Sequence, residues 1–270
     1  MKLRYIAVLG GLLAGGIVGL IPVTVPAAQA AKEAKPVISD EASAALLRMG
    51  QTLRAEQFSF QARTIRVYSE ANGEPLHIFH TLSVTVHRPN RLLAELTGDD
   101  GSNKLVFDGK TLTLFSPQEK KYVSVPVPEG TIERMLKEAV DHLGIDFPLA
   151  DFLSEAPNKA FLTGVTAGRV VNTVTIDGVP CDHLFFFQPP GIELELWLEK
   201  NDRSLPRRLV ATHRSLPDQP NFIAEFSDWN FNIHTSDAEF VFQPPADAVQ
   251  VALKPAAAAT PATKRKGAKQ

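Results

Sequence analysis

Cysteine is almost absent from this 270-residue sequence, because Cys181 is the only one. A single cysteine excludes an internal disulfide bond, so the folded chain must be stabilised by a packed apolar core. The chain is long enough to bury such a core as one large or two small domains. The sixteen phenylalanines are an unusually large share of its apolar residues.

Positive charge is scarce in the body of the chain. Residues 31–251 contain 21 Lys and Arg against 30 Asp and Glu, a net charge of about −9. A nucleic-acid surface requires a basic patch, so this balance argues against a nucleic-acid partner. Residues 252–270 are rich in Ala, Pro and Lys and predict a disordered basic tail. Such a tail is either simply solvated or touches anionic lipid or cell wall.

The one long apolar run lies near the amino end, from Ile6 to Ile21. Lys2 and Arg4 precede this run, and a small-x-small segment that ends at Ala30 follows it. This order is typical of a secretory signal peptide, which predicts cleavage after Ala30. The run is shorter than the roughly 20 residues of a membrane-spanning helix, although an uncleaved anchor is the alternative. We therefore expect residues 1–30 to be an export signal and 31–38 a linker.

The body is dominated by segments in which apolar and polar residues alternate with a period of two, the pattern of half-buried strands. Asn72-Gly73 predicts a tight turn between the first two strands. In the segment 192–199 the alternation is complete, with four aliphatic residues on one face and three Glu with Trp197 on the other. We expect about eleven strands among twelve candidate segments: 58–68, 76–87, 91–97, 103–107, 111–115, 122–127, 160–165, 169–176, 181–188, 192–199, 207–213 and 222–231.

Three helices are expected among these strands. Ser39-Asp40-Glu41 caps a helix whose apolar residues from Ala42 to Leu53 recur with the helical period. A second helix spans Thr131–His142 and ends at Gly144, and a short third one spans Pro148–Leu153. The apolar side of the second helix comprises Ile132, Met135, Leu136, Ala139, Val140 and Leu143.

Three helices cover so many strands only if the sheet curls around them. The predicted fold class is therefore mainly β (α+β), a strongly curved antiparallel half-barrel of about eleven strands with about three helices on the concave side. Such an arrangement often leaves an apolar cavity.

Two hairpins resemble those of the outer-membrane lipoprotein carrier (LolA/LolB-like) superfamily. The first reads FDGKTLTLF followed by SPQEKKYVSV, at 107–125, and the second reads ELWLEKNDRSLPRRLV, at 195–210. The opening helix is followed by a long first hairpin, SFQARTIRVYSEANGEPLHIFHTLSVTVHRPNRL, in the same order as in that superfamily. The likeness covers about residues 40–245 and is greatest to an uncharacterised periplasmic family within that superfamily. It implies one half-barrel domain, here 39–251, with helices as a lid over an apolar cavity that holds acyl chains or lipoproteins.

The resulting hypothesis is a periplasmic, non-enzymatic protein without a cofactor that binds a lipid or the acylated end of a lipoprotein. The alternative is an envelope sensor or assembly module of the same fold that binds protein partners. Transient contact with a membrane or an envelope protein would fit either role. The candidate cavity residues, for which ordinary core packing is the other interpretation, are Phe60, Leu82, Val84, Leu92, Leu114, Met135, Leu136, Phe185, Phe187, Leu194, Leu196 and Phe226.

Two arginines are candidates for a lipid headgroup. Arg63 and Arg66 are three residues apart on the first strand and therefore face opposite sides of the sheet. Whichever points inward would be a costly buried cation unless it meets a carboxylate or a headgroup. The alternative is that both are solvated.

Enzyme motifs are weak. Cys181 and His183 share a strand face, but a nucleophile also needs a base aimed at it and an oxyanion site. Glu193 and Glu195, about 7 Å apart along a strand, would suit a glycosidase pair or would simply keep an exposed face soluble. The sequence has no nucleophile elbow and no phosphate-cradling glycine loop. A hydrolase remains a third possibility.

A metal site is not expected. His77 and His80 are three residues apart, which places them on opposite faces of a strand. Since no third ligand lies near them in the sequence, they do not form the cluster that a metal ion requires.

Overall fold

The structure is a computed structural model that describes residues 37–69, 74–128, 130–144 and 147–252. These residues all belong to the second of two units of the chain, Pro36–Gln270. The expected export signal, nearly all of the linker, the Asn72-Gly73 turn and all but the first residue of the basic tail lie outside the described residues.

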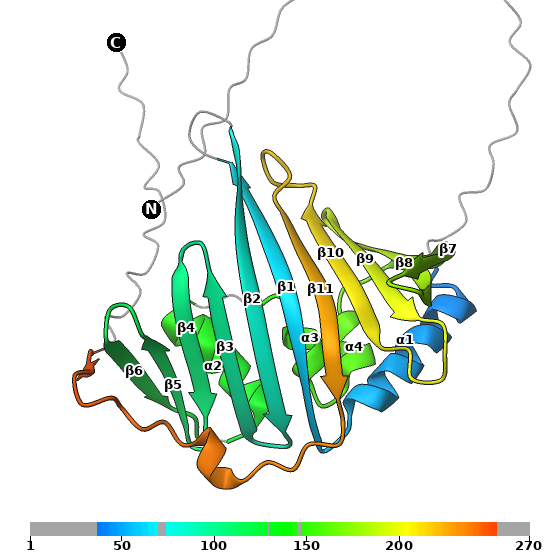
Figure 1. Ribbon diagram of the computed structural model, residues 1–270. Coiled ribbons are helices and arrows are strands. Elements are labelled where there is room, and N and C mark those ends of the chain that lie inside the picture. The colour runs from blue at the N-terminus through cyan, green and yellow to red at the C-terminus, as the bar shows by residue number, and fades with distance from the viewer. Residues whose placement is uncertain (1–36, 70–73, 129, 145–146, 253–270) are drawn as a thin grey trace, which may run out of the picture. The chain divides into compact units, whose positions relative to one another are not determined.

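The described chain forms one twelve-stranded sheet with β7 and β12 at its edges (Figure 1). Its order is β12-β6-β5-β4-β3-β2-β1-β11-β10-β9-β8-β7, and every neighbouring pair is antiparallel except β12 with β6. The strands are β1 (Gln57–Ser69), β2 (Pro75–His87), β3 (Arg91–Gly98), β4 (Gly101–Phe107), β5 (Thr111–Ser116), β6 (Lys121–Pro126), β7 (Ala167–Ile176), β8 (Val179–Gln188), β9 (Ile192–Glu199), β10 (Pro206–His213), β11 (Asn221–Asn230) and β12 (Val249–Gln250).

The predicted fold class is confirmed, since the sheet is open, curved and almost wholly antiparallel. The alternation that predicted the strands also decides which face is buried. On β2, Leu82 and Val84 are buried on the helix side, whereas Thr81 and Ser83 are exposed on the other side. Successive residues of a strand point to opposite faces of the sheet. The apolar face is therefore buried against the helices, and the polar face is exposed to solvent.

The described residues form four α-helices, which lie on the concave face of the sheet (Figure 1). They are α1 (Asp40–Leu53), α2 (Ile132–Leu143), α3 (Ala150–Leu153) and α4 (Pro157–Phe161). The Ser39 hydroxyl accepts a hydrogen bond from the Ala42 amide at 3.2 Å and so caps α1. Gly144 ends α2 in the left-handed conformation, with φ of 63°, as its position predicted.

The core lies between these helices and the concave face. Helix α1 contributes Leu46, Met49 and Leu53, each fully buried. Arg88, at the end of β2, ties two helices to the sheet. Its guanidinium donates hydrogen bonds to the carbonyls of Leu53 at 3.1 Å and Leu153 at 2.8 Å, which lie at helix ends, where the helix itself supplies no donor.

The predicted strand at 160–165 is wrong, because this segment begins in helix α4 and continues as a turn. The cause is tertiary. In α4 the Phe161 ring packs against Phe152 and Phe186, with centroid distances of 6.2 and 5.4 Å. The third helix begins at Ala150 rather than at Pro148. Val140, expected on the apolar side of α2, is 54% exposed.

After β11 the chain forms a strap along one end of the sheet to its far edge (Figure 1). The strap contains the 3₁₀ helix η1 (Asp237–Phe240) and ends in β12, which the sequence did not predict. Phe240 is fully buried beside the ring of His87. Lys120 and Asp247 form an ion pair of 2.5 Å that holds the strap next to β6.

Candidate functional site

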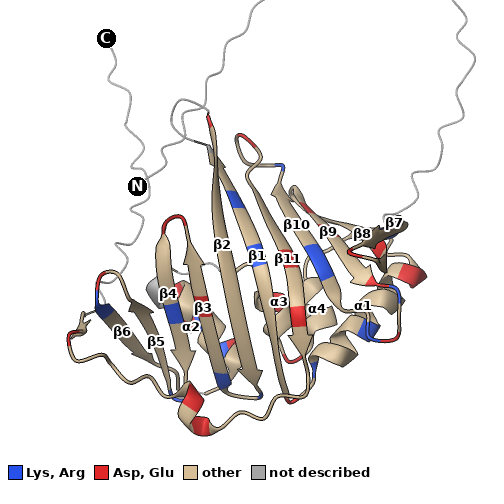
Figure 2. Cartoon of the chain, in the orientation of Figure 1, with Lys and Arg blue, Asp and Glu red and all other residues tan. Residues whose placement is uncertain are grey.

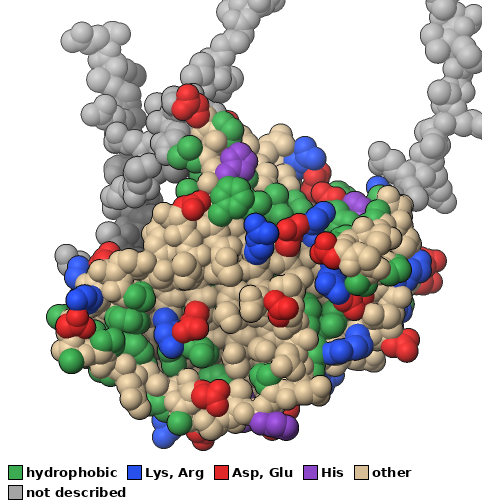
Figure 3. All heavy atoms as spheres, in the orientation of Figure 1, with side chains coloured by type: hydrophobic (Ala, Val, Ile, Leu, Met, Phe, Trp, Pro, Cys, Tyr) green, Lys and Arg blue, Asp and Glu red, His purple; other side chains and the backbone are tan. Residues whose placement is uncertain are grey.

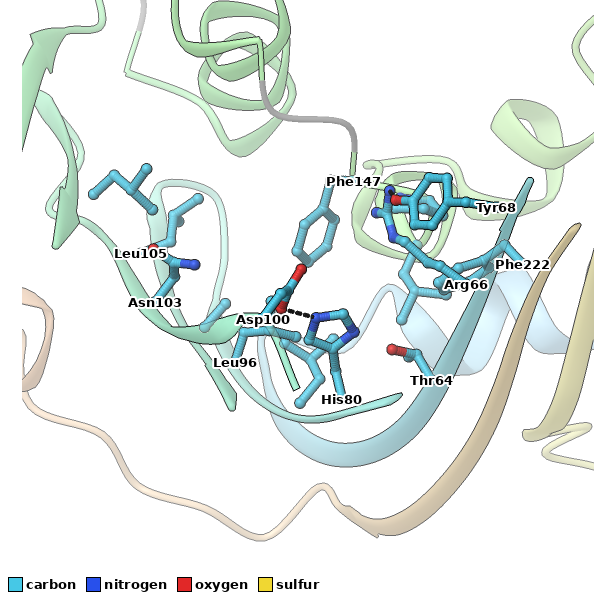
Figure 4. Close-up of a pocket in the computed structure, with 15 residues that line it drawn as sticks. Thr64, Arg66, Tyr68, His80, Leu96, Asp100, Asn103, Leu105, Phe147 and Phe222 are labelled. Carbon is cyan, nitrogen blue, oxygen red and sulfur yellow. Dashed lines mark hydrogen bonds and ion pairs between the residues drawn. The ribbon is translucent and has the colours of Figure 1, made fainter. Parts of the chain in front are cut away.

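A cavity of about 250 Å³ opens on the concave face (Figure 4). Its wall is formed by β1 to β5 and by Phe222 of β11, and the segment 147–149 covers it. Phe147 points into the space between the β1 and β4 walls (Figure 4). The apolar lining residues are Leu82, Ala94, Leu96, Leu105, Leu114, Phe147, Pro148, Leu149 and Phe222.

The polar lining residues are Thr64, Arg66, Tyr68, His80, Asp100 and Asn103. His80 and Asp100 form a pair, with Nε2 of the imidazole 2.6 Å from Oδ1 of the carboxylate. The His80 side chain is only 5% exposed, whereas Asp100 is 62% exposed. His80 therefore lies at the buried floor of the cavity, and Asp100 lies at its open end, at the β3–β4 turn. Acidic residues gather at this turn (Figure 2).

Arg66 lies on the cavity side of β1. The alternation that buries Phe60, Ala62 and Thr64 on the concave face continues to Arg66 and Tyr68 near the end of the strand. The Arg66 guanidinium carbon lies 5.6 Å from the centre of the Phe222 ring, a cation–π geometry. Its Nη1 is 3.5 Å from the Tyr68 hydroxyl.

Arg63 faces the outer, convex surface, so the two arginines lie on opposite faces as the sequence predicted. Of the two headgroup candidates, only Arg66 is at the cavity. Arg63 borders a groove on the outer face together with Phe79 and Ile223.

Two of the predicted cavity residues, Leu82 and Leu114, line the cavity. Leu136 and Leu194 are half-buried and pack against the core, next to a solid cluster that contains Phe60, Val84, Leu92, Met135, Leu196 and Phe226. Phe185 and Phe187 lie on the outer face. Their neighbours Leu184 and Phe186 take the inward positions of β8, and alternation sends the flanking rings outward.

Several lining residues were missed from the sequence. Leu96 and Leu105 follow the strand alternation and were therefore accessible to the same reasoning. His80 was considered only as a metal ligand. Phe147 and Leu149 carry no signal of their own, because they reach the cavity only through the way residues 147–149, ahead of α3, lie over the sheet.

The other sites considered from the sequence are dispersed. Cys181 is fully buried and its Sγ contacts the Val179 carbonyl at 3.4 Å. Burial raises the pKa of this thiol, mainly by desolvation. His183 is engaged elsewhere, with its ring stacked at 4.1 Å on Trp197 and its Nε2 2.8 Å from Glu195. Cys181 therefore has neither the thiolate character nor the base of a nucleophile.

Two of the three acids of β9 are paired with arginines. Glu193 accepts a hydrogen bond from Arg214 at 2.7 Å, and Glu199 accepts one from Arg207 at 2.7 Å. Within the described ranges no three His, Cys, Asp or Glu side chains come together as a metal-binding group. No helix in that same part of the chain has the length and apolarity needed to cross a membrane.

Several solved structures are similar to this chain. An uncharacterised conserved protein from Thermus thermophilus is 12% identical, with a TM-score of 0.47 over 78% of this chain and 100% of that chain. The Mycobacterium tuberculosis lipoprotein LppX is 15% identical, with a TM-score of 0.43 over 73% and 100%. A LolA superfamily protein from Nitrosomonas europaea is 10% identical, with a TM-score of 0.39 over 74% and 97%.

A comparison with functionally curated proteins found no match. A family model described as a predicted periplasmic protein, DUF2092, matches residues 42–254. This match spans nearly all of the domain for which the sequence predicted an uncharacterised periplasmic family, and it confirms that prediction. The chain therefore belongs to the DUF2092 family of predicted periplasmic proteins.

Proposed function

We propose that this protein is a non-enzymatic binding protein of the periplasm that holds an acyl chain, from a lipid or from an acylated lipoprotein, in the cavity on its concave face. The observation that carries the proposal is the cavity itself. Leu82, Leu105 and Leu149 line it and are at most 6% exposed, so a preformed apolar space lies inside the curve of the sheet. Ligand sites are typically concave, mostly apolar and preformed.

The size of the cavity favours one chain over several. Its volume of about 250 Å³ is just below the usual range of ligand pockets, roughly 300–1,000 Å³. Burying about fifteen methylenes would gain about 12 kcal/mol before costs, at about 0.8 kcal/mol each. Association costs about 4–15 kcal/mol, so binding depends on how much of that cost a rigid wall removes.

The strands that form the cavity wall are well suited to being rigid. Strands β1 and β2 pair over thirteen residues each, from Gln57 opposite His87 to Ser69 opposite Pro75. Helix α1 packs on α3, α4 and β7 and buries Leu46, Met49 and Leu53 in the core. It is therefore part of the fixed frame, whereas the resemblance implied that the helices form a lid. The cover of the cavity is the segment 147–149, which directly precedes α3.

The proposal includes export, with the signal peptide removed after Ala30, a folded domain over 39–251 and a basic tail from residue 252. Intact-mass measurement of protein recovered from a periplasmic extract tests this part. A mass that begins at Ala31 and extends to Gln270 is expected, and a mass that retains residues 1–30 contradicts cleavage.

The decisive experiment is purification without delipidation, followed by solvent extraction and mass spectrometry. We expect a stoichiometric acyl-containing compound, and added fatty acid should raise the melting temperature of delipidated protein. Ala94→Leu fills the cavity from β3 and should abolish both effects. Thr97→Leu is the matched control, because Thr97 is exposed on the outer face of the same strand. Absence of extracted lipid and of any melting shift would sink the proposal.

One observation favours the alternative, a module that binds protein partners. On the outer face Phe79 is 48% exposed and borders a groove with Ile65 and Ile223. Hydrophobic side chains are visible on this face over the upper parts of β1, β2 and β11 (Figure 3). A photo-crosslinker at Phe79 that captures one envelope protein in cells, with none captured from Thr85, would favour this second function.

A further inference from the structure

The cavity is amphipathic along its depth. Leu149 is 1% exposed, Leu82 4% and Leu105 6%, so the deep part is apolar and closed. Tyr68 is 49% exposed and Asp100 62%, and both lie at the open end. An elongated ligand with a polar head therefore has one favourable orientation, with its chain inward and its head between the β1 wall and the β3–β4 turn.

The open end of the cavity carries one charge of each sign. Among the described lining residues, Arg66 is the only Lys or Arg and Asp100 is the only Asp or Glu. The carboxylate of Asp100 is held by His80 at 2.6 Å. Arg66 is a cation with five N–H donors in a planar fork, a geometry that suits a carboxylate or a phosphate.

The position of Arg66 is supported from two sides. Its guanidinium lies over the Phe222 ring, and Tyr68 adds a hydroxyl 3.5 Å from Nη1 (Figure 4). Stacking on an aromatic ring restricts the side chain before a ligand arrives, which lowers the entropy cost of binding. The Tyr68 hydroxyl lies beside the same position and is itself a donor to an anion.

From this geometry we propose that the ligand is a single-chain amphiphile with an anionic head, whose carboxylate or phosphate binds the Arg66 guanidinium while its chain contacts Leu82, Leu105 and Leu149. This inference rests on the proposed function and adds the chemistry of the head to it. Arg66 is the residue that distinguishes charged heads, because it is the only Lys or Arg among the described lining residues, whereas Asp100 has the wrong charge for an anion.

The test compares four probes of equal chain length, used below their micelle concentrations: dodecanoate, dodecyl phosphate, dodecanol and dodecylammonium. Their affinities are measured by calorimetry with delipidated protein. Dodecanoate and dodecyl phosphate should bind more tightly than dodecanol, and dodecylammonium should bind least. The order of the two anions identifies whether the natural head is a carboxylate or a phosphate.

Arg66→Gln should weaken dodecanoate and dodecyl phosphate by roughly 10- to 100-fold and leave dodecanol unchanged, since it removes one charge-assisted contact and no apolar surface of the deep pocket. Arg66→Lys keeps the charge but loses the fork, so it should recover part of the anion affinity. Arg63→Gln is the matched control on the opposite face of β1 and should change nothing. Melting temperatures verify that all three variants fold.

The outcomes separate the two proposals. Equal affinity for dodecanol and dodecanoate in the wild type, or the same loss in Arg63→Gln as in Arg66→Gln, overturns the anionic head and leaves acyl binding intact. If none of the four probes binds, acyl binding fails as well, and the anionic head fails with it.

Discussion

Gly98 lies directly opposite His80 in the β2–β3 ladder, and a methyl group at position 98 would lie 2.3 Å from the Cδ2 atom of that imidazole and 2.3 Å from the Phe79 carbonyl oxygen. The absence of a side chain at 98 therefore lets the ring of His80 and the backbone of β2 approach β3. This close approach sets the position of the His80–Asp100 pair at the open end of the cavity.

Gly98→Ala should consequently destabilise the protein by about 1–3 kcal/mol, because the added methyl must displace a backbone atom rather than a flexible side chain. Denaturant unfolding measures the change. Thr97→Ala, one residue earlier and exposed, is the control and should stay within about 0.5 kcal/mol of wild type. Equal stabilities for the two variants would show that β2 and β3 adjust without cost.

Arg88 should be among the most important residues for stability. Its removal leaves the carbonyls of Leu53 and Leu153 without their donor, so we expect Arg88→Ala to cost about 2–4 kcal/mol of unfolding free energy. Burial lowers the pKa of Arg88, mainly by desolvation, yet an arginine stays charged at neutral pH. Arg54→Ala, an exposed arginine at the end of α1, should have little effect. A small cost at Arg88 would mean that water replaces the guanidinium.

The strap should be held by a charge pair with a defined pH window. The hydrogen bond and charge of Lys120 lower the pKa of Asp247, and the same contact raises the pKa of Lys120. Because the pKa of Asp247 is lowered, its carboxylate stabilises the folded state fully at pH values above the ordinary carboxyl pKa, about 3.9. This contribution is lost as the pH falls through the lowered pKa. Because the pKa of Lys120 is raised, its ammonium group stabilises the folded state fully at pH values below about 10.4. This contribution is lost as the pH rises through the raised pKa.

Within that window, Asp247→Asn should make the strap amides of Val249 and Val251, which bond to Lys120 and Tyr122, exchange with solvent up to about fivefold faster. Hydrogen exchange with mass-spectrometric detection follows this segment. Glu119→Gln breaks a neighbouring ion pair with Lys121 that does not involve the strap and should leave the rate unchanged. Identical rates in Asp247→Asn and wild type would exclude the pair as a latch.

Cys181 should be chemically silent in the folded protein. Because burial raises the pKa of its thiol, little thiolate is present at neutral pH, and the side chain is fully enclosed. An aromatic disulfide reagent should label the protein only after urea unfolding, with one equivalent per chain. Rapid labelling of native protein, or hydrolase turnover that is lost in Cys181→Ala, would instead support the enzyme hypothesis.

Much of the fold was predictable because strand alternation is a local property. β9 was predicted with its observed bounds, Ile192–Glu199, since its aliphatic residues and its acids alternate without interruption. The strand prediction for the segment 160–165 failed for the opposite reason. Its local pattern suits a strand, but burial of Phe161 against Phe152 and Phe186 stabilises a helix instead.

The candidate site was predictable only in part. Alternation placed Arg63 and Arg66 on opposite faces, but it does not say which face encloses space. The same rule left open which of Phe185, Phe186 and Phe187 turns inward, and the structure places Phe186 in the core.

The sequence by itself determined the alternation of the strands, the caps of the first two helices and the separation of the two arginines, because each depends on residues close together in the chain. Only the tertiary structure decided where the sheet curves, that Phe147 and Leu149 cover β1 to β5, and that Leu82 borders a cavity while Val84 lies in solid core. An unfilled space arises where the curved sheet encloses more volume than the side chains that reach it occupy. Residues distant in sequence set both volumes.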